Sequence, residues 1–506
     1  MRPIKFHLTI AHLWGLAALM GIFVFVSTHP IRPHDFWWHI TIGREIITTG
    51  KIPTTDIYSY TEAGRPYPSY QMYWLMETAL YIIYRVGGPA LVIFIHSLTI
   101  TSAYGVIFYI CKRITKSWRM AAFGVLFAAA LGLNDWNVRP QGITFLLASL
   151  YLLAIVEYNQ NPRWYWLIVF PICMLIWVNS HGTFLIGLVL IGIWWGQKIW
   201  ENIKHLIDGE NPFNKKPIFI SGMMFGITGL VCLINPRGLG IVNYVKTLTS
   251  NSVVQNLVTE WAPPTLSTLM GVIFFCGLIV SAILLAFSPK RPNFFQISTF
   301  LVFGILGLKT SRGSVWFGLV MAPTVAEHLS AIVNNLQKAK RTPANQEGSR
   351  ILNILFTVVI LTMGVIALPW FKYKLPLPAP KAGLISAETP VHATQILLDQ
   401  KPPGELFNAM SFGSYLIWAA YPQYQVFVDS RIELFSDKVW SDYLNISNAN
   451  GDWEALLRDY GVNTLMLSLA EQPVLVSAVG GSNEWKMIYQ DDVSGIFMRQ
   501  SSSQKP

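Results

Sequence analysis

The sequence predicts a polytopic α-helical membrane protein with about 11 transmembrane helices, followed by a C-terminal extracytoplasmic α/β domain. Three observations support this fold class. The chain of 506 residues is 52% hydrophobic and 13% charged, whereas soluble domains carry roughly 25% charged residues. Apolar runs close to the ~20 residues needed to cross a bilayer recur from the N-terminus to Trp370. After Trp370 the composition becomes that of an ordinary globular domain.

Composition and charge also narrow the class of partner. In a soluble chain, the net charge of +10 would suggest a nucleic-acid partner. Here the basic residues lie mostly in short connectors between apolar runs, as in membrane proteins. We therefore expect no nucleic-acid partner. The 19 Trp, 20 Tyr and 29 Phe residues are typical of interfacial aromatic belts. All cysteines lie within apolar runs and show neither disulfide nor metal-ligand spacing: Cys111, Cys173, Cys232 and Cys276.

The apolar runs predict the membrane spans one by one. The first follows Arg2 and Lys5, is too long for the core of a signal peptide and lacks a small-residue cleavage site, so we expect it to be retained. The eleven expected spans are 8–28, 89–111, 119–134, 141–157, 164–179, 182–199, 218–234, 267–287, 294–309, 313–331 and 351–370.

The distribution of charge predicts the orientation. With eleven spans the connectors alternate between two sides, and most lysines and arginines fall in short connectors on the side of the N-terminus. The other side collects acids: Asp35, Glu45, Asp56, Glu62, Glu77, Asp135 and Glu260. We therefore expect a multi-pass protein of the inner or plasma membrane, with a cytoplasmic N-terminus and an extracytoplasmic C-terminal domain.

Four segments outside the spans complete the organisation. The membrane domain 1–370 includes a long first external loop, 29–88, whose last part (Tyr70–Arg85) reads as an amphipathic helix leading into the second span. A Pro-rich linker, 371–385, and the α/β domain 386–500 follow, with 501–506 as a disordered tail. In that domain, helices and strands, some of them in parallel pairs, alternate: helices at Val391–Asp399, Tyr415–Tyr421 and Trp453–Tyr460, and strands at Glu405–Asn408, Gln425–Val428, Thr464–Ser468, Lys486–Tyr489 and Gly495–Arg499.

Asp35, at the head of the first external loop, is the first candidate for catalysis. It follows Pro33 and precedes a helix-like stretch, so it suits a helix N-cap. A carboxylate at a partly apolar interface can also have its pKa raised by desolvation and accept a proton from an acceptor hydroxyl. Both interpretations stay open from the residues alone.

The same loop holds a second acid and an aromatic group. Asp56 after Pro53 is typical of an Asx turn, but it could also orient an acceptor. Trp37, Trp38, Tyr58 and Tyr60 could line a sugar site or anchor the loop at the interface.

Cationic residues at the outer ends of the spans are candidates for binding a lipid phosphate. Charge near the membrane is costly unless it is used, and the forked guanidinium group suits phosphate. Structural pairing and packing at a helix end are the competing interpretations for Arg139, Arg237, Arg312 and His181.

Several motifs together resemble a known family. They include Asp35-x-Trp37-Trp38-His39-Ile40-x-x-Gly43 and Gly50-Lys51-Ile52-Pro53-x-x-Asp56-x-Tyr58-Ser59-Tyr60-Thr61 in the loop, then Arg139-Pro140-Gln141, Trp177-x-Asn179-x-His181-Gly182, Asn235-Pro236-x-Gly238, Phe407-Asn408 and Val428-Asp429-x-Arg431. The chain resembles, over nearly its whole length, a prokaryotic branch of the C-type (GT-C) glycosyltransferase superfamily, related to the protein O-mannosyltransferases and the bacterial lipid A sugar transferases.

The resemblance implies a function and residue roles. Such enzymes move a sugar from a polyprenyl-phosphate donor to a lipid, glycan or protein acceptor on the extracytoplasmic face, usually with inversion, and an acid of the first external loop is the base. That role falls on Asp35, with Asp56 as a second catalytic acid. Several relatives have two adjacent acids where this chain has His34-Asp35, so we expect no metal cofactor. The substrate-binding candidates are His39, Arg139, His181, Arg237, Arg312, Trp37, Trp38 and Tyr58, whereas Asp429 and Arg431 suit a surface ion pair better than an acceptor site.

Three other functions remain as alternatives. A polysaccharide polymerase or ligase would depend on Arg139, His181 and Arg237 more than on Asp35. A transporter should show broken helices and charges near mid-membrane, whereas the charges here lie at span ends. A non-catalytic scaffold would tolerate the loss of Asp35.

Overall fold

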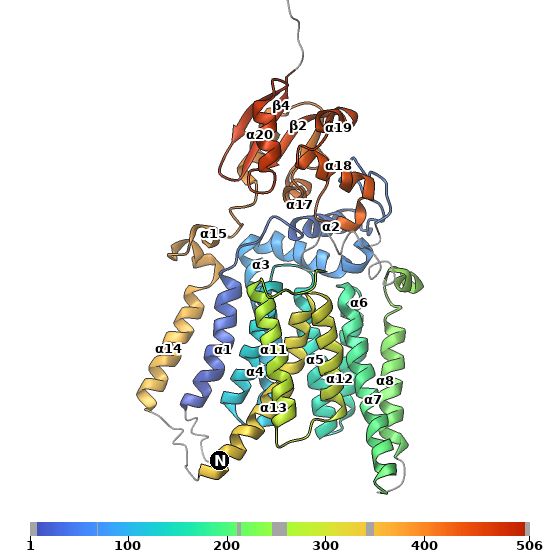
Figure 1. The fold of residues 1–506 in the computed structure, drawn as a ribbon, viewed down its shortest axis with the longest axis vertical. Coiled ribbons are helices and arrows are strands. Elements are labelled where there is room, and N and C mark those ends of the chain that lie inside the picture. Colours follow the sequence, from blue (N-terminus) through green and yellow to red (C-terminus); the bar gives the residue numbers. More distant parts are fainter. Residues whose placement is uncertain (1–7, 68, 210–213, 245–260, 341–348, 501–506) are drawn as a thin grey trace, which may run out of the picture. The chain divides into compact units, whose positions relative to one another are not determined.

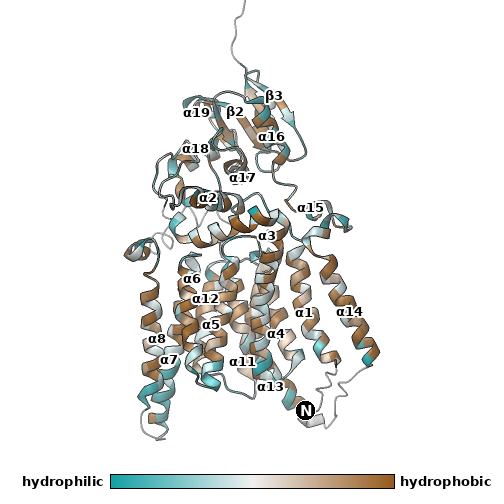
Figure 2. Cartoon of the chain, turned by 180° about the vertical axis from the view of Figure 1, so that it is seen from behind, coloured by the Kyte–Doolittle hydropathy of each residue, from teal (hydrophilic) through white to brown (hydrophobic). Residues whose placement is uncertain are grey.

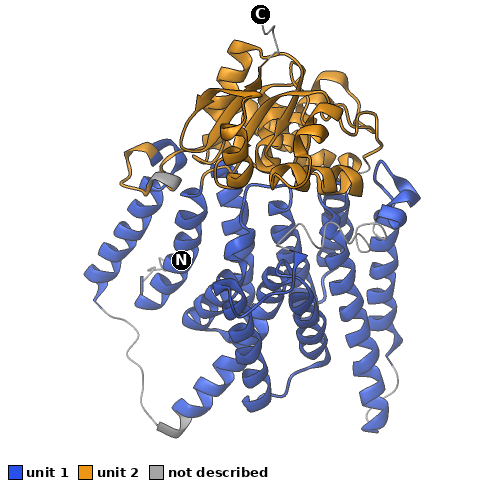
Figure 3. Cartoon of the chain, turned by 45° about the horizontal axis from the view of Figure 1, so that its top comes forward, with its two compact units in different colours: residues 1–29, 93–245, 258–372 blue, residues 30–92, 246–257, 373–506 orange. Residues whose placement is uncertain are grey.

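The computed structural model describes residues 8–67, 69–209, 214–244, 261–340 and 349–500, so the predicted tail 501–506 lies outside the described residues. The chain forms two compact units (Figure 3). Unit 1 comprises 1–29, 93–245 and 258–372, and unit 2 comprises 30–92, 246–257 and 373–506.

Unit 1 is a bundle of helices that lie side by side (Figure 1). Each predicted span coincides with a described helix, and Figure 2 shows hydrophobic residues along most of their length. The helices are α1 (Ile10–Ser27), the second part of α3 (Tyr70–Thr115), α4 (Trp118–Gly132), α5 (Gly142–Gln160), α6 (Trp164–Val178), α7 (Leu185–Ile207), α8 (Lys215–Val231), α11 (Leu269–Phe287), α12 (Phe294–Lys309), α13 (Gly313–Lys340) and α14 (Arg350–Ile366).

The prediction of a polytopic helical protein is confirmed at this level. Among the described residues, 6 helices are long and apolar enough to cross a membrane, and α6, α12 and α14 are shorter apolar helices. The figure of eleven spans stays a prediction.

Small residues allow the central helices of unit 1 to approach closely. A Cβ on Gly124 of α4 would lie 3.1 Å from the Ala322 carbonyl oxygen of α13, and one on Gly318 of α13 would lie 2.7 Å from Leu131 of α4. Such contacts are typical of helix pairs in membranes, where close packing replaces the hydrophobic effect as the driving force.

A kink divides α3 between the two units. Gly87 (φ −139°, ψ 15°) and Gly88 (φ 62°, ψ −162°) leave the helical conformation, and Pro89 follows. The positive φ at Gly88 is a conformation that glycine adopts without steric cost. The part of α3 before the kink belongs to unit 2, as expected for a helix that leads into the second span.

Unit 2 contains a small mixed sheet, as predicted for the C-terminal region. Its strand order is β1-β2-β4-β3, with β1 and β2 parallel and the other pairs antiparallel. The strands are β1 (Glu405–Asn408), β2 (Val462–Ser468), β3 (Trp485–Gln490) and β4 (Ser494–Arg499), and the helices with them include α16 (Val391–Gln400), α17 (Met410–Ala419), α18 (Asp437–Ser447), α19 (Trp453–Asp459) and α20 (Pro473–Gly481).

One predicted strand, Gln425–Val428, does not join the sheet. Val426 instead forms an isolated parallel bridge with Ser59 of the first loop. Its N–H donates to the Tyr58 carbonyl (3.0 Å), and its carbonyl accepts from the Tyr60 N–H (3.3 Å). The alternating pattern of this segment therefore reflects pairing with a distant loop.

The first loop folds as part of unit 2. It forms α2 (Phe36–Thr49) and the first part of α3, and α2 packs on α17. Ile31 also forms a bridge with Ile385. We expected the loop to belong to the membrane domain, and the structure differs because the partners of the loop are supplied by the C-terminal region.

Candidate active site

Asp35 occupies the N-cap position of α2 and is half-buried. Its carbonyl accepts the His39 N–H at 3.1 Å, but its side chain makes no capping hydrogen bond. An N-cap aspartate normally accepts a backbone N–H of the first turn through its carboxylate. The structure therefore does not show the capping hydrogen bond that the sequence suggested.

The aromatic residues of α2 are buried, whereas both roles that we considered for them, lining a sugar site and anchoring the loop at the interface, need exposed rings. Trp37 is 0% exposed and Trp38 is 4% exposed. The Trp37 ring lies 4.9 Å from that of Tyr415, and Trp38 packs against Tyr67 at 6.3 Å. Both indoles are core side chains of unit 2, so they are not available as sugar-binding faces in this arrangement. Their spacing along one helix contains no signal that separates the two roles.

His39 belongs to a buried pair that the sequence did not single out. Its Nδ1 lies 2.9 Å from Oε1 of Glu77 on α3, and both side chains are buried. A carboxylate at Nδ1 fixes the tautomer and orientation of an imidazole. The other oxygen, Oε2 of Glu77, has no hydrogen-bond partner among the described residues. The available signal was an acid inside an otherwise apolar helix.

The helices that carry this pair are in close contact. A Cβ on Gly43 of α2 would lie 2.1 Å from the Glu77 carbonyl oxygen and 2.8 Å from the Tyr81 Cβ. Only glycine fits at this crossing, which brings His39 within reach of Glu77.

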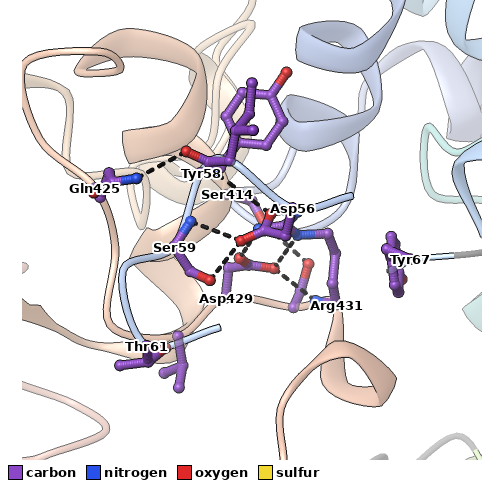
Figure 4. A network of polar contacts seen from close by, with 12 residues as sticks. Asp56, Tyr58, Ser59, Thr61, Tyr67, Ser414, Gln425, Asp429 and Arg431 are labelled. Atoms are coloured by element: carbon purple, nitrogen blue, oxygen red, sulfur yellow. Dashed lines mark hydrogen bonds and ion pairs between the residues drawn. The ribbon is translucent and has the colours of Figure 1, made fainter. Parts of the chain in front are cut away.

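Asp56 lies in a buried cluster that joins the first loop to the C-terminal region (Figure 4). Arg431 Nη1 donates to Asp56 Oδ1 at 2.5 Å. The same guanidinium group binds Asp429 through two nitrogens, Nε to Oδ1 at 2.8 Å and Nη2 to Oδ2 at 2.5 Å. The side chains of all three residues are 0% exposed. Asp429 and Arg431 thus form the expected ion pair, but it is buried and not on the surface.

The remaining acceptor positions of Asp56 are also used. The Ser59 N–H and hydroxyl donate to Oδ2 at 2.9 and 2.6 Å, and the Tyr70 hydroxyl donates to Oδ1 at 3.2 Å. The backbone bond forms the local turn that the sequence suggested. An ionised carboxylate has about four lone-pair positions, so these donors leave little capacity for another proton donor.

Electrostatics keeps Asp56 ionised. Burial raises the pKa of its carboxyl group, but Arg431 and the hydrogen bonds from Ser59 outweigh burial, so the pKa lies below the usual value. A carboxylate of low pKa that is saturated with donors is a weak proton acceptor. This environment gives Asp56 the properties of a structural anion.

Tyr58 packs against the same cluster. It is 1% exposed, with its ring 4.9 Å from that of Tyr421 and 5.6 Å from the Arg431 guanidinium carbon. Burial raises the pKa of its hydroxyl group. The structure therefore places Tyr58, like Trp37 and Trp38, in the core of unit 2.

The predicted phosphate-binding cations belong to unit 1. His181 caps η2 (Gly182–Phe184), with its Nδ1 accepting the Thr183 N–H at 3.2 Å. This bond accounts for His181 as a helix-end histidine. The guanidinium carbon of Arg237 lies 5.8 Å from the ring of Tyr244.

Arg312 directly precedes α13, and Arg139 lies three residues before the first residue of α5, both in unit 1. Arg312 lies 5.8 Å from the Trp261 ring and lines a cavity of about 290 Å³ with Asp135. A guanidinium group beside a cavity suits an anionic ligand. Asp35 belongs to unit 2, so its convergence with these cations stays a prediction.

Within the described ranges, no group of three or more His, Cys, Asp and Glu side chains could hold a metal ion. The buried pair of His39 and Glu77 has two such side chains, fewer than the three of a metal-binding group.

Comparison with known proteins supports the fold that these elements suggest. No protein-family profile and no curated protein matches the sequence. Among solved structures, ArnT from Cupriavidus metallidurans bound to undecaprenyl phosphate is 13% identical, with a TM-score of 0.51 over 98% of this chain and 99% of that chain. The arabinofuranosyltransferase AftD from Mycobacteria is 10% identical, with a TM-score of 0.56 over 99% of this chain.

The two structural relatives differ in size. This chain spans nearly all of ArnT but 41% of AftD. ArnT and AftD are both GT-C glycosyltransferases, so the predicted resemblance is confirmed at the level of the fold.

Proposed function

We propose that this protein is a membrane glycosyltransferase that moves a sugar from a polyprenyl-phosphate-linked donor to a lipid, glycan or protein acceptor on the extracytoplasmic face. One observation carries the proposal: the fold matches, over nearly the full length of both chains, a protein with undecaprenyl phosphate bound. The apolar helices of unit 1 would hold such a carrier within the bilayer.

Asp35 is the proposed general base. Of the two catalytic candidates in the first loop, Asp56 is the less suitable base, because its carboxylate is committed to Arg431, Ser59 and Tyr70. The choice between them therefore follows from the hydrogen bonds of Asp56.

The proposed chemistry is a single displacement at C1 of the sugar. The acceptor oxygen forms a bond to C1 while the bond from C1 to the phosphate oxygen breaks, and the acceptor proton passes to the Asp35 carboxylate. The polyprenyl phosphate leaves with the bonding electron pair. Arg139, Arg237 and Arg312 would stabilise its negative charge.

The test is sugar transfer by the purified full-length protein in liposomes that contain a polyprenyl-phosphate sugar. Replacing a general base lowers the rate by about 10²–10⁴-fold, so Asp35→Asn should lose at least about a hundredfold in rate while membrane abundance stays normal. Asp452→Asn is the matched control, because Asp452 caps α19 in the same unit through its side chain and asparagine is an equally good cap.

Two outcomes would contradict the proposal. Undiminished transfer by Asp35→Asn would remove Asp35 from the role of base. Efficient transfer from a soluble nucleotide sugar, with none from a polyprenyl-linked donor, would reject the donor class. The proposal includes no metal, so transfer should continue in the presence of a chelator.

A further inference from the structure

The connector between α3 and α4 is strongly basic. Its cations are Lys112, Arg113, Lys116 and Arg119. Glu157 of α5 is buried and neutralises one of them, because it accepts from Arg113 Nε at 3.1 Å. Four cations and one acid leave a net charge of +3 at this end of the helices.

Two of these cations are available to a ligand. Lys116 and Arg119 are both exposed, and neither forms an ion pair within the described part of the chain. Lys112 lies beside them, since its Nζ donates to the Lys116 carbonyl at 3.0 Å. Like charges held close together repel one another, so a bound anion would be stabilised here.

The connector lies at the end of the bundle where α1 begins. The ring of Trp118, the first residue of α4, lies 4.5 Å from that of His12 in the first turn of α1. The Lys112 Nζ lies 5.3 Å from the Trp118 ring. A tryptophan between apolar residues and cations is typical of the interface between a membrane and water.

Other described connectors on this side have less uncompensated charge. In the α7–α8 connector, residues 198–216 contain four lysines and three acids, a net charge of +1, and Lys198 forms an ion pair with Glu201 at 2.9 Å. In the α11–α12 connector, Lys290 forms an ion pair with Glu327. The α3–α4 connector therefore favours an anion more strongly than these two do.

An apolar stripe on α4 begins at the same place. Arg119 is followed, four and seven positions later, by Phe123 and Leu126, which are 41% and 48% exposed. Side chains at this spacing lie on one face of a helix. The other faces of α4 pack against α1, α11 and α13. The exposed face of this membrane helix therefore has a cation at its end and apolar side chains along its length.

We propose that this face binds an anionic phospholipid from the leaflet on the N-terminal side. The phosphate would lie at Lys116 and Arg119, and an acyl chain would lie along Phe123 and Leu126 toward the middle of the membrane. A phospholipid has this order of groups, because its phosphate lies at the membrane surface and its chains extend inward. A zwitterionic lipid would add a positive charge to a connector that already has +3, so a lipid of net negative charge is favoured.

The test measures lipid binding, so its outcome does not depend on the glycosyl transfer proposed above. It uses the purified full-length protein in detergent, with phosphatidylglycerol and phosphatidylcholine labelled on identical acyl chains. Phosphatidylglycerol should bind more tightly, and its preference should fall as salt is added, because salt screens exposed charges. Unlabelled inorganic phosphate at the concentration of the lipid should not displace it, since phosphate has no chain to contact α4.

Variants then assign the site. A cation beside the membrane contributes about fivefold to the binding of an anionic lipid, so Lys116→Gln with Arg119→Gln should weaken binding of phosphatidylglycerol about 25-fold and leave that of phosphatidylcholine unchanged. Lys204→Gln with Lys216→Gln is the matched control, because both lysines are exposed in the α7–α8 connector. Phe123→Ala should weaken binding of both lipids, because both have acyl chains.

Four results would overturn the proposal. Equal affinity for the two lipids at low salt would exclude recognition of the charge. Equal effects of the two double variants would show that the α3–α4 connector is not the site. Displacement of the lipid by inorganic phosphate would indicate an anion site without a lipid. A dimer that Phe123→Ala dissociates would show that a second copy of the chain covers this face.

Discussion

Replacing Arg431 by an uncharged residue should lower the stability of unit 2 far more than replacing an exposed arginine of the same unit. Arg431 lies between the carboxylates of Asp56 and Asp429, and the side chains of all three residues are 0% exposed. Arg431→Leu would leave two buried carboxylates without their counter-ion. Breaking a buried pair in this way costs about 3–5 kcal/mol, a large part of the ~5–15 kcal/mol by which domains are stable.

The cluster also predicts an order of effects. Asp56→Asn removes one charge but leaves Arg431 paired with Asp429, so its cost should be that of one charged hydrogen bond, about 1.5–3 kcal/mol. Arg458 is the matched control, because its side chain is 48% exposed and its nearest carboxylates lie at 3.6 and 3.7 Å. Exposed pairs contribute about 0–1 kcal/mol.

The assay is urea-dependent protease cleavage within unit 2 of the full-length protein in detergent. The change in the free energy of unfolding is the shift in the urea midpoint multiplied by the slope of the unfolding free energy against urea concentration. We expect the order Arg431→Leu, then Asp56→Asn, then Arg458→Leu, from most to least destabilised. If Arg431→Leu and Arg458→Leu shift the midpoint equally, the cluster does not hold unit 2 together.

Three further predictions follow from individual residues. Burial raises the pKa of Asp56, but Arg431 and Ser59 lower it more, so the pKa in the folded protein lies below the usual 3.8. The stabilisation by the Asp56 charge is therefore complete above pH 3.8 and is lost as the pH falls through the folded pKa. If the urea midpoint of Asp56→Asn falls as steeply below pH 3.8 as that of the unchanged protein, this pH dependence does not come from Asp56. Gly43→Ala should destabilise unit 2 by about 1–3 kcal/mol through overpacking, because the added Cβ would lie 2.1 Å from the Glu77 carbonyl oxygen. The control in the same urea assay is Gly480→Ala, whose added Cβ meets nothing within 4 Å. A cysteine placed at exposed Gln395 should react with a membrane-impermeant maleimide on intact cells, whereas a cysteine placed at exposed Lys204 should react only after the cells are permeabilised. The reverse pattern would invert the proposed topology.

Local patterns predicted much of the fold because the structural cause is local. The strand Glu405–Asn408 was predicted with its observed bounds, and each expected span coincides with a described helix. A run of apolar residues indicates burial or contact with lipid, and an alternation of apolar and polar residues indicates a half-buried strand. The expected amphipathic helix Tyr70–Arg85 likewise ends just before the observed kink at Gly87 and Gly88.

The partners of polar side chains could not be predicted in this way. Arg431 and Asp56 are separated by 375 positions, and nothing in the local sequence of either residue identifies the other. The same limit applies to Gln425–Val428, whose pattern was that of a strand but whose partner is the first loop. Burial of Trp37 also depends on Tyr415, which lies in the C-terminal region far along the chain.

The environment of Asp56 shows why a buried aspartate of the first loop is unsuited to act as a base. An acid acts as a base when its charged form is accessible and not already stabilised by several donors. Asp56 fails that condition because Arg431, Ser59 and Tyr70 bind both of its oxygens. Its charge instead ties the first loop, which carries Asp35, to the C-terminal region within one compact unit. The C-terminal region therefore contributes to the proposed reaction by fixing the fold of this loop, so substitutions at Asp429 should reduce sugar transfer without contact with either substrate.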